Sequence, residues 1–450
     1  KSPDLPQAHI LRSLSNVKVT SIHTSHSGCH AIALSLDGNA FLFGRNQNGA
    51  LGLPSSVPAV SETTPIKVKP TSLPGATPGS RFVSAACGRS HSLLVASDGH
   101  MWASGANNFG QCGQNPCSET KGFKPVSSPW LKSDPADKAI KIGAGLTFSL
   151  VLTESGKVYS FGSGDKGQLG NGRTGEYIIT GGKTGFEIVS EPILVKGAID
   201  GKKIVDISCG QQHSIALDTD GYVYVWGFNG YCRLGLGHQK DVMLPTIVPQ
   251  FSGENEITRG LFVAAGPTNS VVVDRQRMYQ MAGKWKNSGE GSTGQPYTTF
   301  RFIPDIMSCK MLYVSSGGVT HWCITPDDED ENAPSSPVMT VAWGQNAHNG
   351  ELGFGEGQPK SATKPQRLRP LDGVDVFSIA AGQNTTFFLA SPGGAELPRH
   401  PEEVDHPELC VICSKDLGDD ELELECEKCD SPYHLKCLTP PLKEVPEGEW

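Results

Sequence analysis

Residues 87–113 read CGRSHSLLVASDGHMWASGANNFGQCG, and residues 209–235 read CGQQHSIALDTDGYVYVWGFNGYCRLG. In both stretches an apolar run precedes an Asp-Gly pair, and a second apolar run leads to a turn bounded by glycines. Two such runs around Asp-Gly are typical of a β-hairpin. The two copies therefore predict a repeated unit built from antiparallel strands.

The unit recurs along the chain with a constant internal offset. One position is filled by His30, His91, Phe148, His213, Asn269, His321 and Thr385, and a second by Gly44, Gly105, Gly162, Gly227, Gly283 and Gly344. The two positions are 14 residues apart in the first five units. In the sixth they are 23 apart, because that unit contains the insertion TPDDEDENAPSSP at 325–337.

The spacing of the units predicts how they stack. They recur every 52 to 65 residues and show no helical periodicity, so each is expected to form one small sheet. Such a sheet cannot bury both faces alone, and radial stacking would bury them and protect the strand edges. The 53 glycines and 32 prolines supply the tight turns that this all-β architecture needs.

The stretches VSAACGRSHSLLVASDGH, VWGFNGYCRLGLGHQKD and AWGQNAHNGELGFG resemble the repeat of the regulator of chromosome condensation family, in its telophase-disc-like branch. The resemblance implies a seven-bladed β-propeller over residues 1–391. The chain holds seven first halves of the repeat but only six second halves, so one blade is expected to be incomplete. The family closes its ring by pairing N- and C-terminal strands in one blade, and the missing half is therefore expected upstream of Lys1.

The propeller residues point to binding rather than catalysis. Histidines spread one per blade cannot converge on a ligand, so we expect them to be structural. The sequence also has no phosphate loop, nucleophile elbow or H-E-x-x-H motif.

The long segment 171–204 is either a binding loop or a neutral insertion. The acidic stretch at 327–331 is expected to be a solvated loop, with a histone contact as the alternative. In the resembled family, one propeller face contacts a small GTPase and promotes nucleotide exchange, and the other face contacts nucleosomes.

The C-terminal segment carries closely spaced cysteines in the order of metal ligands. Pairs two residues apart can both reach one tetrahedral ion, and a segment so poor in apolar residues would gain its folding free energy from zinc. The six residues are Cys410, Cys413, Cys426, Cys429, His434 and Cys437.

This order, followed by YHLKCLTPPLKEVPEGEW at 433–450, resembles a plant homeodomain (PHD) finger. The resemblance implies interleaved zinc sites, two in the complete finger. Residues Cys410, Cys413, His434 and Cys437 would form one complete site in this chain. Cys426 and Cys429 would form half of the second, whose remaining pair is expected after Trp450, itself a core residue.

PHD fingers of this kind bind the histone H3 N-terminal tail as an added strand. The position of the usual aromatic-cage tryptophan is Pro432, so no cage for trimethyl-lysine is expected. Readers of the unmodified tail use carboxylates against its amines and its second-position arginine, and Glu427 and Asp430 match such positions. The expected histone-binding residues are Glu423, Leu424, Glu425, Glu427 and Asp430.

Composition constrains the compartment and partners. Residues 396–450 carry 16 acidic and 5 basic side chains, which favours basic peptides over bare nucleic acid. The scattered remaining cysteines favour a reducing compartment, and no apolar run is long enough to span a membrane.

We therefore expect a nuclear, chromatin-associated binding protein with no small-molecule substrate. Its propeller at 1–391 would be joined by a flexible linker at 392–408 to the finger at 409–450. The alternatives are a guanine-nucleotide exchange factor for a small GTPase, or the reader portion of a larger chromatin-modifying enzyme.

Overall fold

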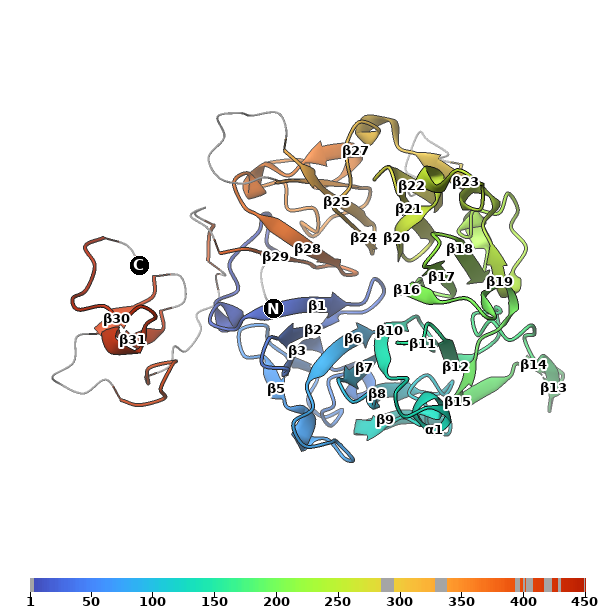
Figure 1. Ribbon diagram of the computed structural model, residues 1–450, viewed down its shortest axis with the longest axis horizontal. Helices are drawn as coiled ribbons and strands as arrows, with labels where there is room; N and C mark the ends of the chain where they lie inside the picture. Colours follow the sequence, from blue (N-terminus) through green and yellow to red (C-terminus); the bar gives the residue numbers. More distant parts are fainter. Residues whose placement is uncertain are drawn as a thin grey trace.

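The computed structural model describes residues 4–284, 295–327, 338–392, 397–399, 401, 408–416, 423–427, 430–448 and 450. Its main body is a ring of antiparallel sheets, and the chain runs once around this ring from blue to orange in Figure 1. The C-terminal residues form a small separate unit at the left of the same view. The predicted all-β propeller is therefore confirmed.

Six sheets of four or five strands follow one another along the chain. The first sheet contains β1 (Val19–Thr24), β2 (His30–Ser35), β3 (Ala40–Arg45), β4 (Ala59–Val60) and β5 (Ile66–Val68). The second contains β6 (Phe82–Cys87), β7 (His91–Ala96), β8 (Met101–Asn107) and β9 (Cys117–Pro125). The third contains β10 (Ala139–Ala144), β11 (Phe148–Thr153), β12 (Val158–Ser163) and β15 (Ile188–Leu194). The fourth sheet contains β16 (Ile204–Cys209), β17 (His213–Asp218), β18 (Val223–Gly227) and β19 (Val242–Ile247). The fifth contains β20 (Gly260–Ala265), β21 (Asn269–Asp274), β22 (Tyr279–Gly283) and β23 (Tyr297–Phe302). The sixth contains β24 (Tyr313–Gly317), β25 (Thr320–Pro326), β26 (Val338–Gly344) and β27 (Ala362–Arg367).

Helical structure is short in the described chain. It consists of α1 (Pro129–Ser133) and the 3-10 turns η1 (Arg12–Leu14), η2 (Gln47–Gly49), η3 (Pro70–Ser72), η4 (Gly197–Ile199), η5 (Gly230–Cys232), η6 (Pro249–Phe251), η7 (Glu256–Thr258), η8 (Pro304–Ile306), η9 (Arg369–Leu371) and η10 (Leu435–Cys437). Among the residues described, none of these helices has the length and apolar character needed to cross a membrane.

The expected count of seven blades is corrected to six complete ones in the described residues. The seventh place in the ring holds only the two-stranded hairpin of β28 (Val376–Ala381) and β29 (Thr386–Ala390), because the chain supplies no second half of the repeat there. This hairpin lies between the last and the first sheets (Figure 1). Phe388 packs edge-on against Trp322 of β25 at 5.3 Å between ring centroids, and Phe387 against Phe43 of β3 at 5.5 Å.

The strand register follows the repeat offset that the sequence predicts. His91 pairs with Gly105 and His213 with Gly227, and the first, third and fifth blades repeat this pairing. The sixth blade differs by one residue, because Gly344 pairs with Thr320 rather than with His321. Thr320, and not His321, is therefore the structural equivalent of His91.

The apolar core lies between neighbouring sheets rather than in one central mass. One cluster joins Leu93 and Val95 of the second blade to Val151 and Phe161 of the third, and equivalent clusters join the following pairs. Two more clusters place the hairpin of β28 and β29 between the sixth blade and the first. This arrangement explains why the second strands β2, β7, β11, β17 and β21 are buried along their whole length although the blades are only one sheet thick.

Two of the recurring histidines connect adjacent blades, as expected for structural residues. The Nε2 atom of His91 lies 3.1 Å from the Ser149 hydroxyl of the third blade, and that of His213 lies 3.1 Å from the Ser270 hydroxyl of the fifth. His91 is fully buried, and burial lowers its pKa to about 3. A Cβ atom on Gly88 would meet the His91 ring at 2.1 Å, so the Gly-x-x-His spacing makes room for the imidazole.

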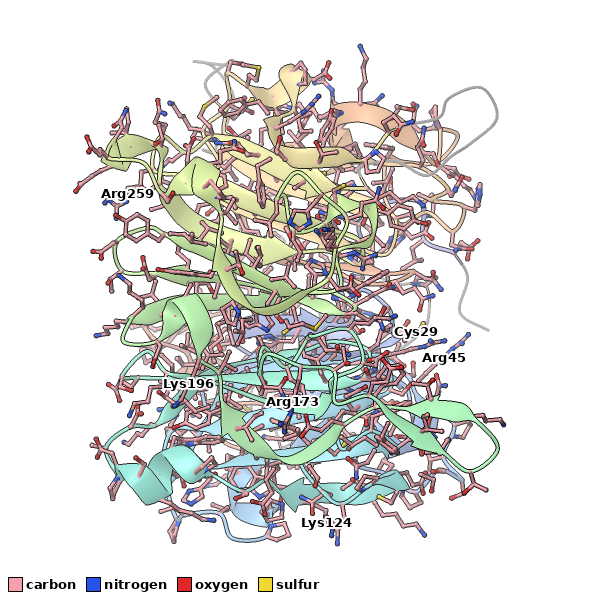
Figure 2. All side chains as sticks on the ribbon, turned by 90° about the vertical axis from the view of Figure 1, so that its right-hand side faces the viewer. Cys29, Arg45, Lys124, Arg173, Lys196 and Arg259 are labelled. Carbon is pink, nitrogen blue, oxygen red and sulfur yellow. The ribbon has the colours of Figure 1, made fainter. Side chains whose placement is uncertain are left out.

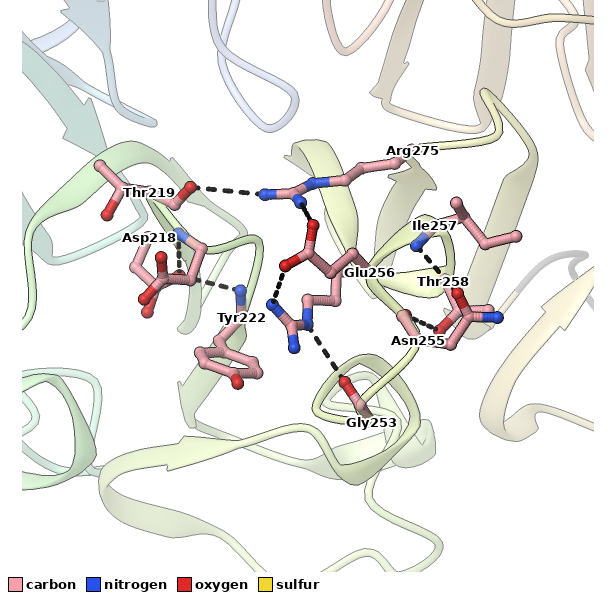
Figure 3. A network of polar contacts seen from close by, with 11 residues as sticks. Asp218, Thr219, Tyr222, Gly253, Asn255, Glu256, Ile257, Thr258 and Arg275 are labelled. Carbon is pink, nitrogen blue, oxygen red and sulfur yellow. Dashed lines mark hydrogen bonds and ion pairs between the residues drawn. The ribbon is translucent and has the colours of Figure 1, made fainter.

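Polar contacts around η7 also connect the fourth and fifth blades. Glu256 forms ion pairs with Arg259 and Arg275, with N–O distances of 3.7 and 3.6 Å. Figure 3 shows its contact with Arg275. Arg275 donates to the Thr219 carbonyl at 3.4 Å, and so ties the fifth blade to the turn after β17. The guanidinium of Arg259 also stacks over the Tyr222 ring at 4.8 Å.

Candidate functional site

The C-terminal unit brings four predicted metal ligands together. One ligand atom from each residue lies within 4.8 Å of the others. The Nδ1 atom of His434 is 3.3 Å from the Sγ atom of Cys413 and 3.7 Å from that of Cys437, and Cys410 is fully buried beside them. Three thiols and one imidazole at this spacing fit a tetrahedral zinc ion. The residues are Cys410, Cys413, His434 and Cys437.

The surroundings of these residues also suit a metal. The Nε2 atom of His434 lies 3.2 Å from the Asp416 carbonyl, which would hold its proton and leave Nδ1 facing the thiols. Burial raises the pKa of the Cys410 thiol, but backbone N–H groups of Cys413, His434 and Ile412 outweigh this effect and lower it to about 6. A thiol with this pKa is largely thiolate at neutral pH, which is the form that binds zinc.

The second cysteine pair begins with the same backbone turn as the first. The Ser414 N–H donates to the Cys410 carbonyl at 2.8 Å, and the Asp430 N–H donates to the Cys426 carbonyl at 2.7 Å. Ser414 and Asp430 both have a left-handed φ, of 56° and 54°. Cys429 lies outside the described residues. The backbone turn that begins at Cys426, like the one at Cys410, is therefore the observation that supports the predicted second zinc half-site.

A two-stranded sheet lies beside the metal cluster. Strand β30 (Glu423–Glu425) pairs antiparallel with β31 (Pro432–His434), and Leu424 stands opposite Tyr433. Leu424 is 4% exposed and belongs to the finger's interior, whereas Glu425 is exposed. The side chain of Glu423 lies outside the described residues. In the described part of the chain the other edge of β30 pairs with no strand, which leaves room for an added one.

The two acids expected to recognise a histone differ in their surroundings. Glu427 is exposed, and its backbone N–H donates to the carbonyl of Trp450 at 3.0 Å. Asp430 is half-buried and already has partners: one carboxylate oxygen contacts Arg12, and the other accepts from Arg399 at 2.8 Å. Neither arginine was marked by a motif: Arg12 lies 418 residues before Asp430 and Arg399 lies 31 residues before it.

Trp450 and Pro432, two further residues named in the sequence prediction for the finger, have structural contacts. Trp450 packs edge-on against Tyr433, with ring centroids 5.1 Å apart, and is half-buried. Pro432 sits in β31 where a cage would need an aromatic ring. The Pro432 carbonyl accepts from the Val411 N–H at 3.2 Å, which ties the sheet to the first cysteine turn.

The propeller carries one protruding element within the long segment 171–204. Strands β13 (Tyr177–Ile179) and β14 (Lys183–Gly185) form a separate hairpin that projects from the third blade (Figure 1). Tyr177 is 52% exposed and Ile178 is 83% exposed. At the base of the hairpin Arg173, labelled in Figure 2, holds both Glu187 oxygens, at 2.6 and 2.9 Å.

Two further propeller features bring polar or charged side chains together. An open hollow of about 460 Å³ lies where the turns between the first and second strands of successive blades meet, and its two charged side chains are those of Arg89 and Glu351. Glu351 already accepts from Asn349 at 2.9 Å. The acidic stretch at 327–331 begins with Asp327, whose side chain is 6% exposed and pairs with Arg367 at 2.8 Å. Asp327 is therefore structural rather than solvated, and residues 328–331 lie outside the described chain.

Comparison with known proteins matches both parts of the chain. The RCC1-like domain family matches residues 3–388, and the PHD-finger family matches residues 410–450. The protein RCC2 homolog of Xenopus laevis is 29% identical over 392 residues, covering 84% of this chain and 69% of that protein.

Two other proteins extend the comparison. The regulator of chromosome condensation of Xenopus laevis is 26% identical over 378 residues, covering 82% of this chain and 81% of that protein. Among solved structures, Prp20p from Saccharomyces cerevisiae superposes with a TM-score of 0.62 at 18% identity, covering 84% of this chain and 83% of that one. This likeness to Prp20p shows the fold alone. From the match over residues 3–388, the chain belongs to the RCC1-like domain family of β-propellers, and it carries a PHD finger after the propeller.

Proposed function

We propose that this is a nuclear, chromatin-associated binding protein whose finger reads the histone H3 N-terminal tail with its fourth-position lysine unmodified. The observation that carries the proposal is the group of acids in and just after β30, whose other edge pairs with no strand among the residues that the structure describes. Glu425 and Glu427 are exposed there, and Asp430 binds guanidinium groups through both of its carboxylate oxygens. A face that binds arginine in this way is suited to the arginine and lysine of a basic tail.

Zinc fits this role as a structural ion. It would be held by Cys410, Cys413, His434 and Cys437, and when bound it supplies folding free energy rather than reactivity. It would fix β31 through His434 and so hold β30 against it. The tail would then add as a strand to β30, with main-chain hydrogen bonds for affinity and the acids for specificity.

A methylation preference follows from the donors of the lysine. An unmodified ammonium can donate three hydrogen bonds to carboxylates such as Glu425 and Glu427, and trimethylation removes all of them. Trimethyl-lysine readers instead need an aromatic cage, for which Pro432 offers no ring. The unmodified tail is therefore the favoured ligand.

In this proposal the propeller is an interaction platform for proteins or nucleosomes. The structure of the relative Prp20p was described together with that protein's binding to Gsp1p and histones. A propeller at residues 1–391 and a finger at 409–450, joined through 392–408, would raise each other's effective concentration on one nucleosome.

The recognition mechanism is tested by anisotropy with a labelled H3 tail peptide and the full-length protein. Glu427→Ala should weaken binding roughly tenfold, because a charge-assisted hydrogen bond is lost. Glu447→Ala removes the same charge from another exposed site of the finger and should change little. Equal affinities for both variants and the parent protein would remove Glu427 from the reading face.

A second candidate function is guanine-nucleotide exchange on a small GTPase. The observation that favours it is the projecting hairpin of β13 and β14, which exposes Tyr177 and Ile178 as a protein contact would require. Exchange needs no catalytic side chain, and release of a fluorescent guanine nucleotide from candidate GTPases tests it directly. Ile178→Asp should abolish any such activity without affecting peptide binding by the finger.

A further inference from the structure

The acid expected to bind the histone arginine is occupied by arginines of this chain. One Asp430 carboxylate oxygen contacts the Nη1 atom of Arg12, and the other accepts from the Nη1 atom of Arg399 at 2.8 Å. The next residue extends this contact, because Asn16 donates from its side-chain amide to the Ser431 hydroxyl at 2.7 Å. Ser431 is 1% exposed, so the finger is seated against this segment rather than merely near it.

The propeller holds both arginines in place. Arg12 begins η1, and Leu14 in the same turn is buried in the cluster of the first blade with Phe43. Arg399 lies beside this segment, because Ile10 forms a parallel bridge with it and donates to the Pro398 carbonyl at 2.8 Å. The two guanidinium groups are therefore presented by a surface that the folded propeller fixes.

An arginine of a bound peptide would compete with Arg12 and Arg399 for the carboxylate of Asp430. Its two oxygens are each taken by one guanidinium, and an arginine from a bound peptide would need the same oxygens. The side chains of Arg12 and Asp430 are only 12% and 23% exposed, so the pair is shielded more than an ordinary surface ion pair.

We infer that Arg12 and Arg399 form an intramolecular latch that competes with a histone tail for Asp430. This inference rests on the proposed function, since it concerns the same acidic face. With the latch closed, Glu425 and Glu427 are the acids of the reading face, among the described side chains, that remain for a tail. The apparent affinity for a tail is then reduced by the fraction of molecules that are latched. A nucleosome surface that binds the segment around Arg12 would release the finger.

Two measurements on the full-length protein test the latch. Arg12→Gln and the double variant with Arg399→Gln should raise the affinity for an H3 tail peptide roughly fivefold, because the latched fraction falls. The same variants should raise amide hydrogen exchange in residues 430–437 while β7 and β11 remain protected. Arg173→Gln is the matched control, since it removes an arginine from a carboxylate pair on the third blade and should leave both readings unchanged.

The outcomes separate the latch from the proposed function. Exchange at 430–437 that does not change in the variants would overturn the latch, whatever the peptide does. Exchange that rises while peptide affinity stays the same would overturn the competition, although the contact would remain. If no variant binds the peptide even when exchange rises, the histone proposal fails, and the competition fails with it.

Discussion

The Nε2 atom of His91 lies 3.1 Å from the hydroxyl of Ser149, so an imidazole of the second blade is bonded to a serine of the third. The Ser149 hydroxyl in turn donates to the Gln111 carbonyl at 2.8 Å. Both residues of the pair are fully buried. The contact links the second blade to the third near the first residues of β7 and β11.

Replacing His91 with alanine should destabilise the propeller by about 3 kcal/mol, because a buried ring is removed and a cavity remains. His100→Ala is the matched control, since the side chain of His100 is 47% exposed. Urea unfolding followed by circular dichroism measures both. A loss for His91→Ala no larger than for the control would show that this contact carries no stability.

The buried histidines also predict how stability depends on pH. Burial lowers the pKa of His30 to about 4 and that of His91 to about 3, both below the value of about 6.5 expected in the unfolded chain. Below pH 6.5 the unfolded state therefore binds more protons, and stability falls as pH falls. Each histidine should cost roughly 2 kcal/mol between pH 6.5 and 5.

The His91→Phe variant isolates this effect, because the third blade already has Phe148 at the equivalent position. Its unfolding free energy should fall less steeply between pH 6.5 and 5 than that of the parent protein. Parallel pH profiles for the two proteins would exclude His91 as the source of the dependence.

Zinc content should depend on the finger and not on the propeller. Cys437→Ser should lower the bound zinc by one ion per molecule, because three ligands hold the ion far less well than four. Cys117→Ser, at an exposed cysteine of β9, should leave it unchanged. Elemental analysis of the purified full-length variants gives the answer, and equal zinc in all three proteins would contradict the assignment.

Much of the propeller could be predicted from the sequence because its repeat has a fixed internal offset. The sequence separation of His91 and Gly105 follows from a hairpin in which five residues of β7 pair with five of β8 across an Asp-Gly turn. The structure confirms this pairing. The prediction failed by one residue at His321. The paired glycines Gly317 and Gly318 offered two alignments there, and strand pairing selects Thr320.

In the finger, the sequence could predict the metal ligands but not the contacts with distant residues. The metal ligands lie close together in the sequence. Cys410 and Cys413 could therefore be assigned as ligands from their spacing, and His434 from the order of cysteines and histidine. The partners of Asp430 could not, because Arg12 reaches it only after the propeller has folded and the first and last parts of the chain have met. No local pattern records such a contact.

The central claim is that the finger reads the unmodified histone H3 tail. The most direct test is a calorimetric titration of the full-length protein with two H3 N-terminal peptides, one unmodified and one trimethylated at the fourth-position lysine. We expect the unmodified peptide to bind and trimethylation to weaken binding at least tenfold, because all three ammonium donors are lost. Tighter binding of the trimethylated peptide, or no heat with either peptide from the Arg12→Gln variant, would contradict this claim.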